Sequence, residues 1–365
     1  MRTDWLRPLN DSDGPFATVV MDATHDTADA TEQYRLRWRD LRERLVDAGA
    51  DNAALAVLDE AVTGANVPDG TAGRVLVADA GRVLLDRHTE VPPERGTAHW
   101  GPVPELLPLL GAVGEQVPTV VVAVDHTGGE IRGVDGTVET VDSGSSGPVH
   151  KASTAGPGEG TGDARVEETW KRNAQAVADR VDKLVRGGNA ELLVVAGDAP
   201  ARARLRDELS PASAEIMTEI ENTGGTVPVQ VDDTVRAAAD EVRERRRSDA
   251  VASFATASGR SDGLAVTGLA DVAAAVRAHA VEMLLIDPAT VPGTDLLVGG
   301  DPTVVGEKPG ELLEDGPTTS VPAGDALVRA VAATDGSVVL THPDDDVTLT
   351  DGLGAVLRFP LGPAA

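Results

Sequence analysis

The pattern of apolar and polar residues divides the chain into three segments of alternating strands and helices. In the first segment, Leu36, Leu41 and Leu45 recur at helical spacing and predict one buried stripe. Prolines at residues 92–108 are expected to interrupt regular structure. The predicted elements of this segment are a strand at residues 16–21, helices at 31–47 and 53–62, and a hairpin of strands at 74–78 and 82–86.

In the middle segment, a long stretch rich in Gly, Ser and Pro at residues 143–162 predicts a loop. Asp163 is a candidate N-cap for a helix at residues 164–186, which Gly187 is expected to end. A second helix is predicted to end at residue 209. The predicted strands of this segment are residues 119–124, 130–134, 137–141, 191–196 and 227–231.

The third segment repeats the alternation and also contains a polar stretch at residues 293–316 that is expected to be irregular. A run of arginines from Arg243 to Arg247 lies on its first helix. The predicted elements are helices at residues 233–254, 270–279 and 325–334, and strands at residues 282–286, 336–340 and 354–359. The whole pattern predicts a mixed α/β protein.

The length of 365 residues exceeds one ordinary core. Three consecutive mixed α/β domains are predicted, at residues 1–115, 116–235 and 236–365, with a glycine-rich loop at residues 154–163 in the central domain. No apolar run approaches the roughly 20 residues that cross a bilayer. The chain is therefore expected to be cytoplasmic, with no membrane partner.

Composition narrows the possible chemistry. The chain has no cysteine, which excludes disulfide scaffolds, Cys-ligated zinc and thiol nucleophiles. Its net charge of −28 is spread along the whole sequence. This acidity fits either avoidance of polyanions or adaptation to a halophilic, salt-rich cytoplasm, and its even spread favours the second. At molar salt the screening length falls to about 3 Å, so local arginine clusters would then decide RNA binding.

Motifs for catalysis are sparse. There is no Gly-x-x-x-x-Gly-Lys-Ser/Thr phosphate loop and no Gly-x-Ser-x-Gly elbow. His25 and His126 each follow a strand beside an aspartate, a position that favours turn stabilisation over catalysis. Asp125 and Asp198 also follow strands, where two carboxylates either cap turns or, as in a metal-dependent nuclease, bind a divalent cation. Turn capping is favoured, and no catalytic residue, metal or cofactor is predicted.

The glycine-rich loop at residues 154–163 is the clearest candidate site. It directly precedes the longest predicted helix of the central domain, and a partner could order it. Lys151, Lys171 and Arg172 form a basic flank suited to phosphate. The residues expected to contact a partner are Gly156, Gly158, Glu159, Gly160, Gly162 and Asp163.

Six groups of residues, taken in order, carry a resemblance to a known family. The groups are residues 14–18 with Asp22 and 25–27, residues 123–128, residues 148–151, residues 172–173 with 176–179, residues 268–272 and residues 351–355. Through them the chain resembles the archaeal and eukaryotic class-1 release factors and Pelota. It is more closely similar to the bacterial and archaeal release-factor-like proteins that include the hibernation factor Balon and its mycobacterial homologue.

The resemblance implies a ribonuclease H-like central domain and a last domain like ribosomal proteins L7Ae and L30e. It also implies a protein that enters the ribosomal A site, contacts rRNA and meets a GTPase of the elongation-factor-Tu type. Release factors carry Gly-Gly-Gln in the central loop, whereas this loop has no glutamine. A role in hibernation or rescue without peptide release is therefore favoured, and peptidyl-tRNA hydrolysis is the alternative.

RNA contact is expected from basic side chains in the first and central domains. Arg35, Arg39 and Arg42 share one face of the first predicted helix, although they could equally pair with nearby carboxylates. The RNA-binding candidates are Lys151, Lys171, Arg172, Arg35, Arg39, Arg42 and His25. The cluster Arg243–Arg247 is a further candidate for phosphate contact, with pairing to nearby Glu241 and Glu244 as its alternative.

Overall fold

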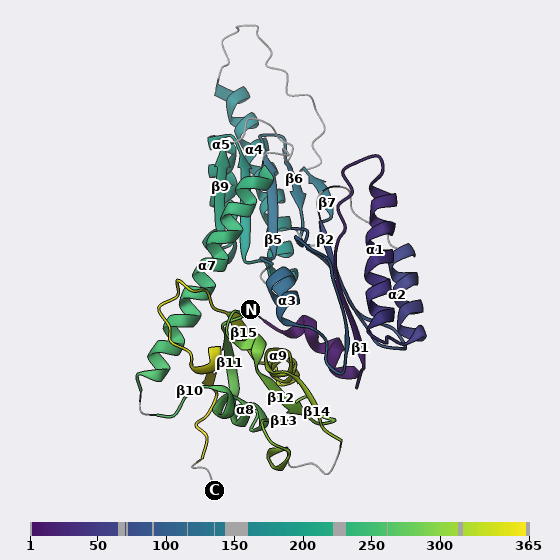
Figure 1. Cartoon of the computed structure of the whole chain (residues 1–365). Coiled ribbons are helices and arrows are strands. Elements are labelled where there is room, and N and C mark those ends of the chain that lie inside the picture. The colour runs from purple at the N-terminus through teal and green to yellow at the C-terminus, as the bar shows by residue number, and fades with distance from the viewer. Residues whose placement is uncertain are drawn as a thin grey trace. The chain divides into compact units, whose positions relative to one another are not determined.

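The computed structural model describes residues 2–64, 70, 72–89, 91–114, 116–134, 136–142, 160–221, 231–260, 262–312 and 317–362. Its contacts group the chain into two compact units. The first unit combines Met1–Glu115 with Arg246–Ala365, and the second is Gln116–Arg245. The prediction of a mixed α/β protein with several sheets is confirmed (Figure 1). The division into three consecutive domains and their finer fold names stay predictions.

The N-terminal part of the first unit is a four-stranded antiparallel sheet in the order β3-β2-β1-β4. Its side chains alternate between two faces, as a pleated strand requires. Ala17, Val19 and Met21 pack under two helices that cover one face (Figure 1). The elements are η1 (Asp4–Asp11), β1 (Phe16–Asp22), α1 (Ala30–Asp47), α2 (Asn52–Gly64), β2 (Gly73–Ala78), β3 (Val83–Thr89), β4 (Thr97–Gly101), α3 (Leu107–Leu109) and η2 (Leu110–Gly114).

The C-terminal part of this unit has two further sheets, in the orders β10-β16-β11-β15 and β13-β12-β14. Helix α9 is buried almost throughout and joins the same apolar cluster as Phe16 and Val20 on the second face of the first sheet. The elements are β10 (Ala265–Thr267), α8 (Leu269–Arg277), β11 (Val281–Ile286), η3 (Val291–Gly293), β12 (Asp295–Val298), β13 (Val305–Gly306), η4 (Pro309–Glu311), β14 (Thr319–Pro322), α9 (Ala323–Ala333), β15 (Ser337–Leu340), η5 (Thr350–Gly352) and β16 (Leu353–Leu357).

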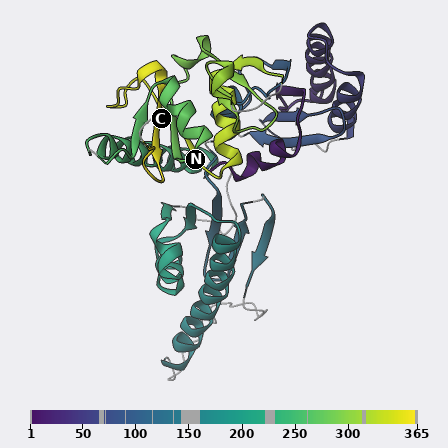
Figure 2. The same cartoon turned by 90° about the horizontal axis from the view of Figure 1, so that it is seen from below.

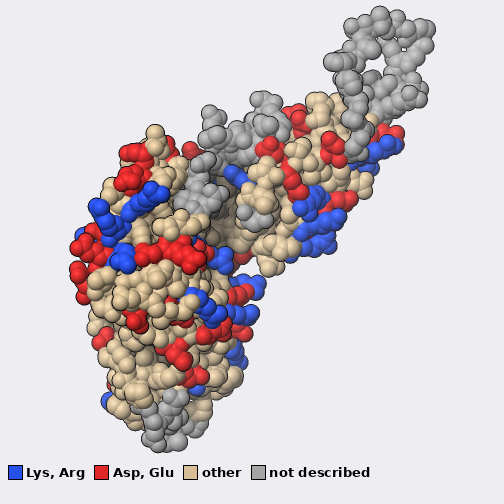
Figure 3. Space-filling view, turned by 90° about the vertical axis from the view of Figure 1, so that its right-hand side faces the viewer, with Lys and Arg blue, Asp and Glu red and all other residues tan. Residues whose placement is uncertain are grey.

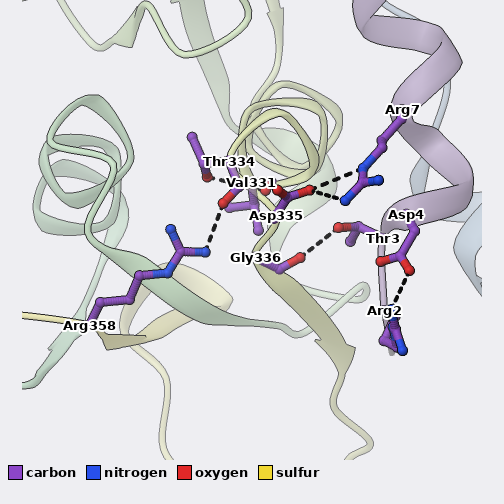
Figure 4. A network of polar contacts seen from close by, with 9 residues as sticks. All are labelled: Arg2, Thr3, Asp4, Arg7, Val331, Thr334, Asp335, Gly336 and Arg358. Atoms are coloured by element: carbon purple, nitrogen blue, oxygen red, sulfur yellow. Dashed lines mark hydrogen bonds and ion pairs between the residues drawn. The ribbon is translucent and has the colours of Figure 1, made fainter.

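Polar contacts fasten the N-terminus of the chain to the end of α9 (Figure 4). The Thr3 hydroxyl donates to the Gly336 carbonyl over 2.6 Å, and Arg7 pairs with Asp335 at 2.8 Å. A cavity of about 450 Å³ nearby is lined by both cationic and acidic side chains, among them Asp301 and Arg358. The Asp301 carboxylate is already engaged by the N–H and the hydroxyl of Thr303.

The second unit is a five-stranded sheet in the order β7-β6-β5-β8-β9. Strands β5, β8 and β9 run parallel, β6 runs antiparallel to β5, and β7 runs antiparallel to β6. Both faces of β5 and β8 are buried, as expected for parallel strands between helices. The elements are β5 (Thr119–Val124), β6 (Gly129–Arg132), β7 (Val138–Val141), α4 (Gly160–Gly187), β8 (Leu192–Gly197), α5 (Ala199–Glu208), α6 (Pro211–Glu215), β9 (Met217–Glu221) and α7 (Val231–Ser258).

Helices α4 and α5 cover one face of this sheet, where Val177 and Val181 meet Val122 and Val195. Helix α7 covers the other face through Ala238, Ala239 and Val242. Gly129 allows α4 to lie close to the sheet, because a Cβ atom there would lie 3.2 Å from the methyl carbons of Val177.

Several expected elements need correction. Leu36 is exposed rather than buried, because Tyr34 and Trp38 fill the buried stripe of α1. β4 forms in the proline-rich region, where it pairs with β1, and β12 and β13 form within residues 293–316. β9 was not predicted at all. The strand expected at residues 227–231 lies largely outside the described residues, and Val231 begins α7.

Candidate functional site

Helix α4 is the element next to the glycine-rich stretch. It is 28 residues long and begins at Gly160, three residues before the N-cap expected at Asp163. That expectation was wrong, because Gly160, Gly162 and Asp163 already have helical backbone. Once a helix has nucleated, each further turn adds hydrogen bonds and offsets the entropy lost by glycine. Lys151, Gly156, Gly158 and Glu159 lie outside the described residues.

Only part of α4 is packed on its sheet. The most N-terminal buried side chains among those described are Asn173 and Ala174, and burial continues through Val185. Glu167 and Glu168 are exposed. Figure 2 shows the helix continuing past the ends of the strands of its own unit. Residues 160–169, at 1.5 Å per residue, add roughly 15 Å of helix beyond the packed part.

Two predicted cations of the basic flank lie on this helix and are exposed. Lys171 lies 3.7 Å from the Glu208 carboxylate, and Arg172 pairs with Glu168 at 2.5 Å on the same helix. Exposed pairs of this kind contribute little free energy, because water and salt screen both charges. Lys171 and Arg172 could therefore exchange these carboxylates for phosphate at small cost.

The three arginines predicted on α1 differ in their surroundings. Arg42 is half-buried and donates from Nε to both carboxylate oxygens of Asp59 on α2, at 3.0 Å each. Trp38 donates to the same carboxylate over 2.9 Å. Arg35 and Arg39 are exposed, and within the described part of the chain neither has an ion pair. Of the three, only Arg42 therefore has a structural role.

His25 lies in the turn after β1 and packs into the first unit. Its ring meets Tyr34 edge-on at 5.9 Å between centroids, and its Nε2 lies 3.3 Å from the Thr31 hydroxyl. Its backbone pairs with Gly70 in an isolated bridge. The Nδ1 atom is buried and has no hydrogen-bond partner. These contacts indicate that His25 stabilises the turn, and RNA contact by His25 stays a prediction.

Asp125 and Asp198 follow the neighbouring parallel strands β5 and β8, and each is engaged locally. Asp125 accepts hydrogen bonds from the N–H and the hydroxyl of Thr127 at 2.7 and 2.6 Å. Burial would raise the pKa of Asp125, but these bonds and that from Gly128 lower it overall. Asp198 is the N-cap of α5 and accepts from the Ala201 N–H at 2.8 Å. Both carboxylates thus have the turn and cap roles favoured by the sequence.

Among the described side chains, no group of three or more His, Asp or Glu residues is placed to hold a metal ion. The arginine run on α7 is also largely occupied. Arg243 pairs with Asp240 at 2.6 Å, and Arg247 pairs with Asp345 at 3.1 Å. Figure 3 shows Lys and Arg side chains mixed with Asp and Glu over the face it draws. In the described part of this acidic chain, many Lys and Arg side chains are therefore paired with nearby carboxylates.

One cluster at the base of α4 was missed by the sequence analysis. The Arg204 guanidinium of α5 lies over the Trp170 indole, 4.9 Å from the ring centroid. His126, in the turn after β5, meets the same indole at 5.4 Å between centroids. Asn173 donates to the His126 carbonyl over 3.0 Å. The only signal in the sequence was the position of His126 after a strand.

Comparison with known proteins gives the class of this chain. Residues 118–260 match the model of "Bacterial archaeo-eukaryotic release factor family 2". The protein Rv2629 of Mycobacterium tuberculosis is 31% identical over 98% of this chain and 97% of its own length. These similarities define a protein of the archaeo-eukaryotic release-factor-like class. More particularly, the chain belongs to the bacterial archaeo-eukaryotic release factor family 2.

Some solved structures show distant similarity to this chain. The Pelota protein of Archaeoglobus fulgidus is 16% identical with a TM-score of 0.35, over 79% of each chain. Dom34 of S. cerevisiae is 10% identical with a TM-score of 0.43, over 80% of each chain.

Among the described helices, none combines the length and the apolar character that crossing a bilayer requires.

Proposed function

We propose that this protein is a ribosome-binding translation factor that occupies the A site in hibernation or rescue and does not release the nascent peptide. The proposal rests on membership of the release-factor-like family and on the sequence next to the projecting helix α4. Residues 154–163 contain no glutamine. The absence of that side chain carries the proposal, because in the related release factors the glutamine of this loop helps water attack peptidyl-tRNA.

No neighbouring glutamine offers a substitute. The next glutamine along the chain is Gln175, which is exposed on α4 within the packed part of the helix. It lies 15 residues after Gly160, or roughly 23 Å along the helix axis. Glu159 cannot replace it, because an ionised carboxylate only accepts hydrogen bonds and donates none. The glycine-rich stretch is proposed to fill the peptidyl transferase centre without taking part in chemistry there.

The basic residues define where RNA would be contacted. Lys171 and Arg172, which are exposed on α4, would contact the large-subunit RNA. Arg35 and Arg39 of α1 would contact the decoding region. Contact with a GTPase of the elongation-factor-Tu type is the corresponding proposal for the C-terminal part. A cytoplasmic location follows from the same proposal.

Two measurements test this function. First, ribosomes from resting and growing cells are sedimented with the purified protein over a range of salt concentrations, and cryo-electron microscopy then locates the bound protein. We expect binding in the A site. Absence from the ribosome pellet at every salt concentration and growth phase would overturn the proposal.

Second, peptide release is measured from stalled ribosome complexes with wild type and Glu159→Ala. We expect no release above background from either. Release by the wild type that Glu159→Ala abolishes would establish the alternative, a peptidyl-tRNA hydrolase. Release that both proteins share would also contradict a non-enzymatic role but would exclude Glu159 from the mechanism.

A further inference from the structure

The base of α4 needs a lateral support that apolar packing does not supply. Among the described side chains of α4, none before Asn173 is buried against the sheet. Trp170 is half-buried and is the first described residue of α4 to make ring contacts with other elements. It therefore stands where the packed helix gives way to the projecting helix.

The contacts of Trp170 come from two separate elements. Arg204 belongs to α5, whose start is fixed by the Asp198 cap, and His126 belongs to the turn that Asp125 organises after β5. A cation over an indole ring is a directional contact, since it is strongest above the ring face. Two contacts from separate rigid elements restrict how the indole, and hence the helix that carries it, can tilt.

The bonding of Arg204 indicates that this contact is its main role. In a chain with 60 acidic residues, Arg204 has no ion pair with a described carboxylate, whereas Arg202 and Arg206 on the same helix both pair with Glu219. The Trp170 Nε1 atom is buried without a hydrogen-bond partner, so Arg204 and His126 contact the indole through its ring and not through a hydrogen bond from its N–H group.

We propose that Arg204, Trp170 and His126 form a collar that sets the direction of the projecting part of α4. In this role Arg204 and Trp170 are positioning residues for the glycine-rich stretch ahead of the helix. This inference rests on the proposed function, because a fixed direction matters only if the stretch must reach a defined site on a partner. The collar reduces the number of orientations that binding has to select.

The direction of α4 can be measured without the ribosome. Because the chain has no cysteine, Glu167→Cys on α4 and Asp207→Cys on α5 give a unique pair of spin-label sites. Double electron–electron resonance then measures the distribution of distances between the two spin labels. Arg204→Ala is compared with Arg204→Lys, which keeps the cation. The matched control is Arg186→Ala, since Arg186 is exposed and its one hydrogen bond to a described residue is donated to the Asp182 carbonyl of its own helix.

We expect Arg204→Ala to broaden the distance distribution about twofold relative to wild type. Arg204→Lys should give an intermediate width, and Arg186→Ala should give the width of the wild type. Ribosome affinity is expected to fall about three- to tenfold in Arg204→Ala, less in Arg204→Lys and not at all in Arg186→Ala. A distribution that stays narrow in folded Arg204→Ala would overturn the collar. A broadened distribution with unchanged affinity would overturn its positioning role.

Trp170→Leu provides a second variant that removes the ring but keeps apolar volume, and thermal unfolding monitors whether it folds. If it fails to fold, the Arg204 variants still decide the inference. If the wild type itself does not bind ribosomes, the proposed function fails and the positioning role fails with it. The spin-label distances still establish or exclude the collar as a mechanical support in that case.

Discussion

Arg42 on α1 donates to both carboxylate oxygens of Asp59 on α2. This pair distinguishes Arg42 from the two other arginines on the same face of α1, Arg35 and Arg39. Arg35 and Arg39 point to solvent and are available to a partner, whereas Arg42 joins two helices. A face that looks uniform in the sequence therefore has two roles that mutation can distinguish.

We expect the double variant Arg35→Ala/Arg39→Ala to weaken ribosome binding and to leave the unfolding free energy unchanged. Arg42→Ala should lower the unfolding free energy by roughly 0.5–1 kcal/mol, a value already reduced for the partial exposure of both charges. Urea denaturation and ribosome sedimentation measure the two effects. Loss of ribosome binding in Arg42→Ala equal to that in the double variant would show that the Arg42–Asp59 pair does not keep Arg42 from contacting the ribosome.

The Arg74–Asp86 pair is expected to be important for the stability of the first sheet. Arg74 is 2% exposed and also contacts the Tyr34 hydroxyl and the Ala61 carbonyl. Removing its partner in Asp86→Ala leaves a buried cation and should cost about 2 kcal/mol, less than for a fully buried pair because Asp86 is 40% exposed. The control Asp40→Ala removes an exposed partner of Arg44 and should cost under about 0.5 kcal/mol. Similar losses in urea denaturation would contradict this ranking.

Acid should destabilise the protein partly through His88. Burial, and after it the nearby Arg74 guanidinium, lower the pKa of His88, while Asp86 acts in the opposite direction. The unfolded chain therefore binds a proton more readily than the folded chain. Stability should fall as pH drops below about 6.5 and towards the lower folded pKa. Thermal unfolding at several pH values should show a shallower dependence in His88→Gln, and an unchanged slope would exclude His88.

Asp325 links α9 to the start of α3 by accepting hydrogen bonds from the Leu106 and Leu107 N–H groups at 2.7 and 3.0 Å. Burial raises the pKa of this carboxyl, so its charged form is unfavourable there. Asp325→Asn keeps an acceptor without charge and should be neutral or stabilising. Asp325→Leu should destabilise by about 1–3 kcal/mol, because two buried donors lose their acceptor. Chemical denaturation of both variants checks the difference.

Magnesium and manganese are expected to leave the melting temperature unchanged. The carboxylates of Asp125 and Asp198 already satisfy a turn and a helix cap, and a cation would have to displace those hydrogen bonds. Calorimetric titration with each metal is the direct test. Saturable binding that Asp125→Asn abolishes would revive the metal-dependent nuclease.

The parts of the fold that follow local patterns were predictable. Residues 119–124 and 191–196 read as buried strands because both of their faces are apolar, and the caps at Asp125 and Asp198 follow from short-range hydrogen bonding. β4 and β9 were not predictable in this way. Their side chains are mostly half-exposed, and their strand character comes from pairing with β1 and β8.

The candidate site shows the same distinction. The glycine-rich stretch and the cations of α4 are visible in the sequence, since both are local features. The Arg204–Trp170–His126 cluster is not, because 78 positions separate His126 from Arg204 and only the packing of α4 and α5 brings them together. The exposure of Leu36 was likewise decided by the larger rings of Tyr34 and Trp38.

Helix α7 has a practical consequence for dissecting this protein. It extends without interruption from Val231 to Ser258, and its apolar residues serve two cores: Ala238, Ala239 and Val242 in one, Val251 and Phe254 in another. A fragment truncated after residue 235 would leave one face of its five-stranded sheet uncovered, and we expect it to aggregate. Recombinant pieces should instead retain α7 through Arg245, the last residue of the second unit.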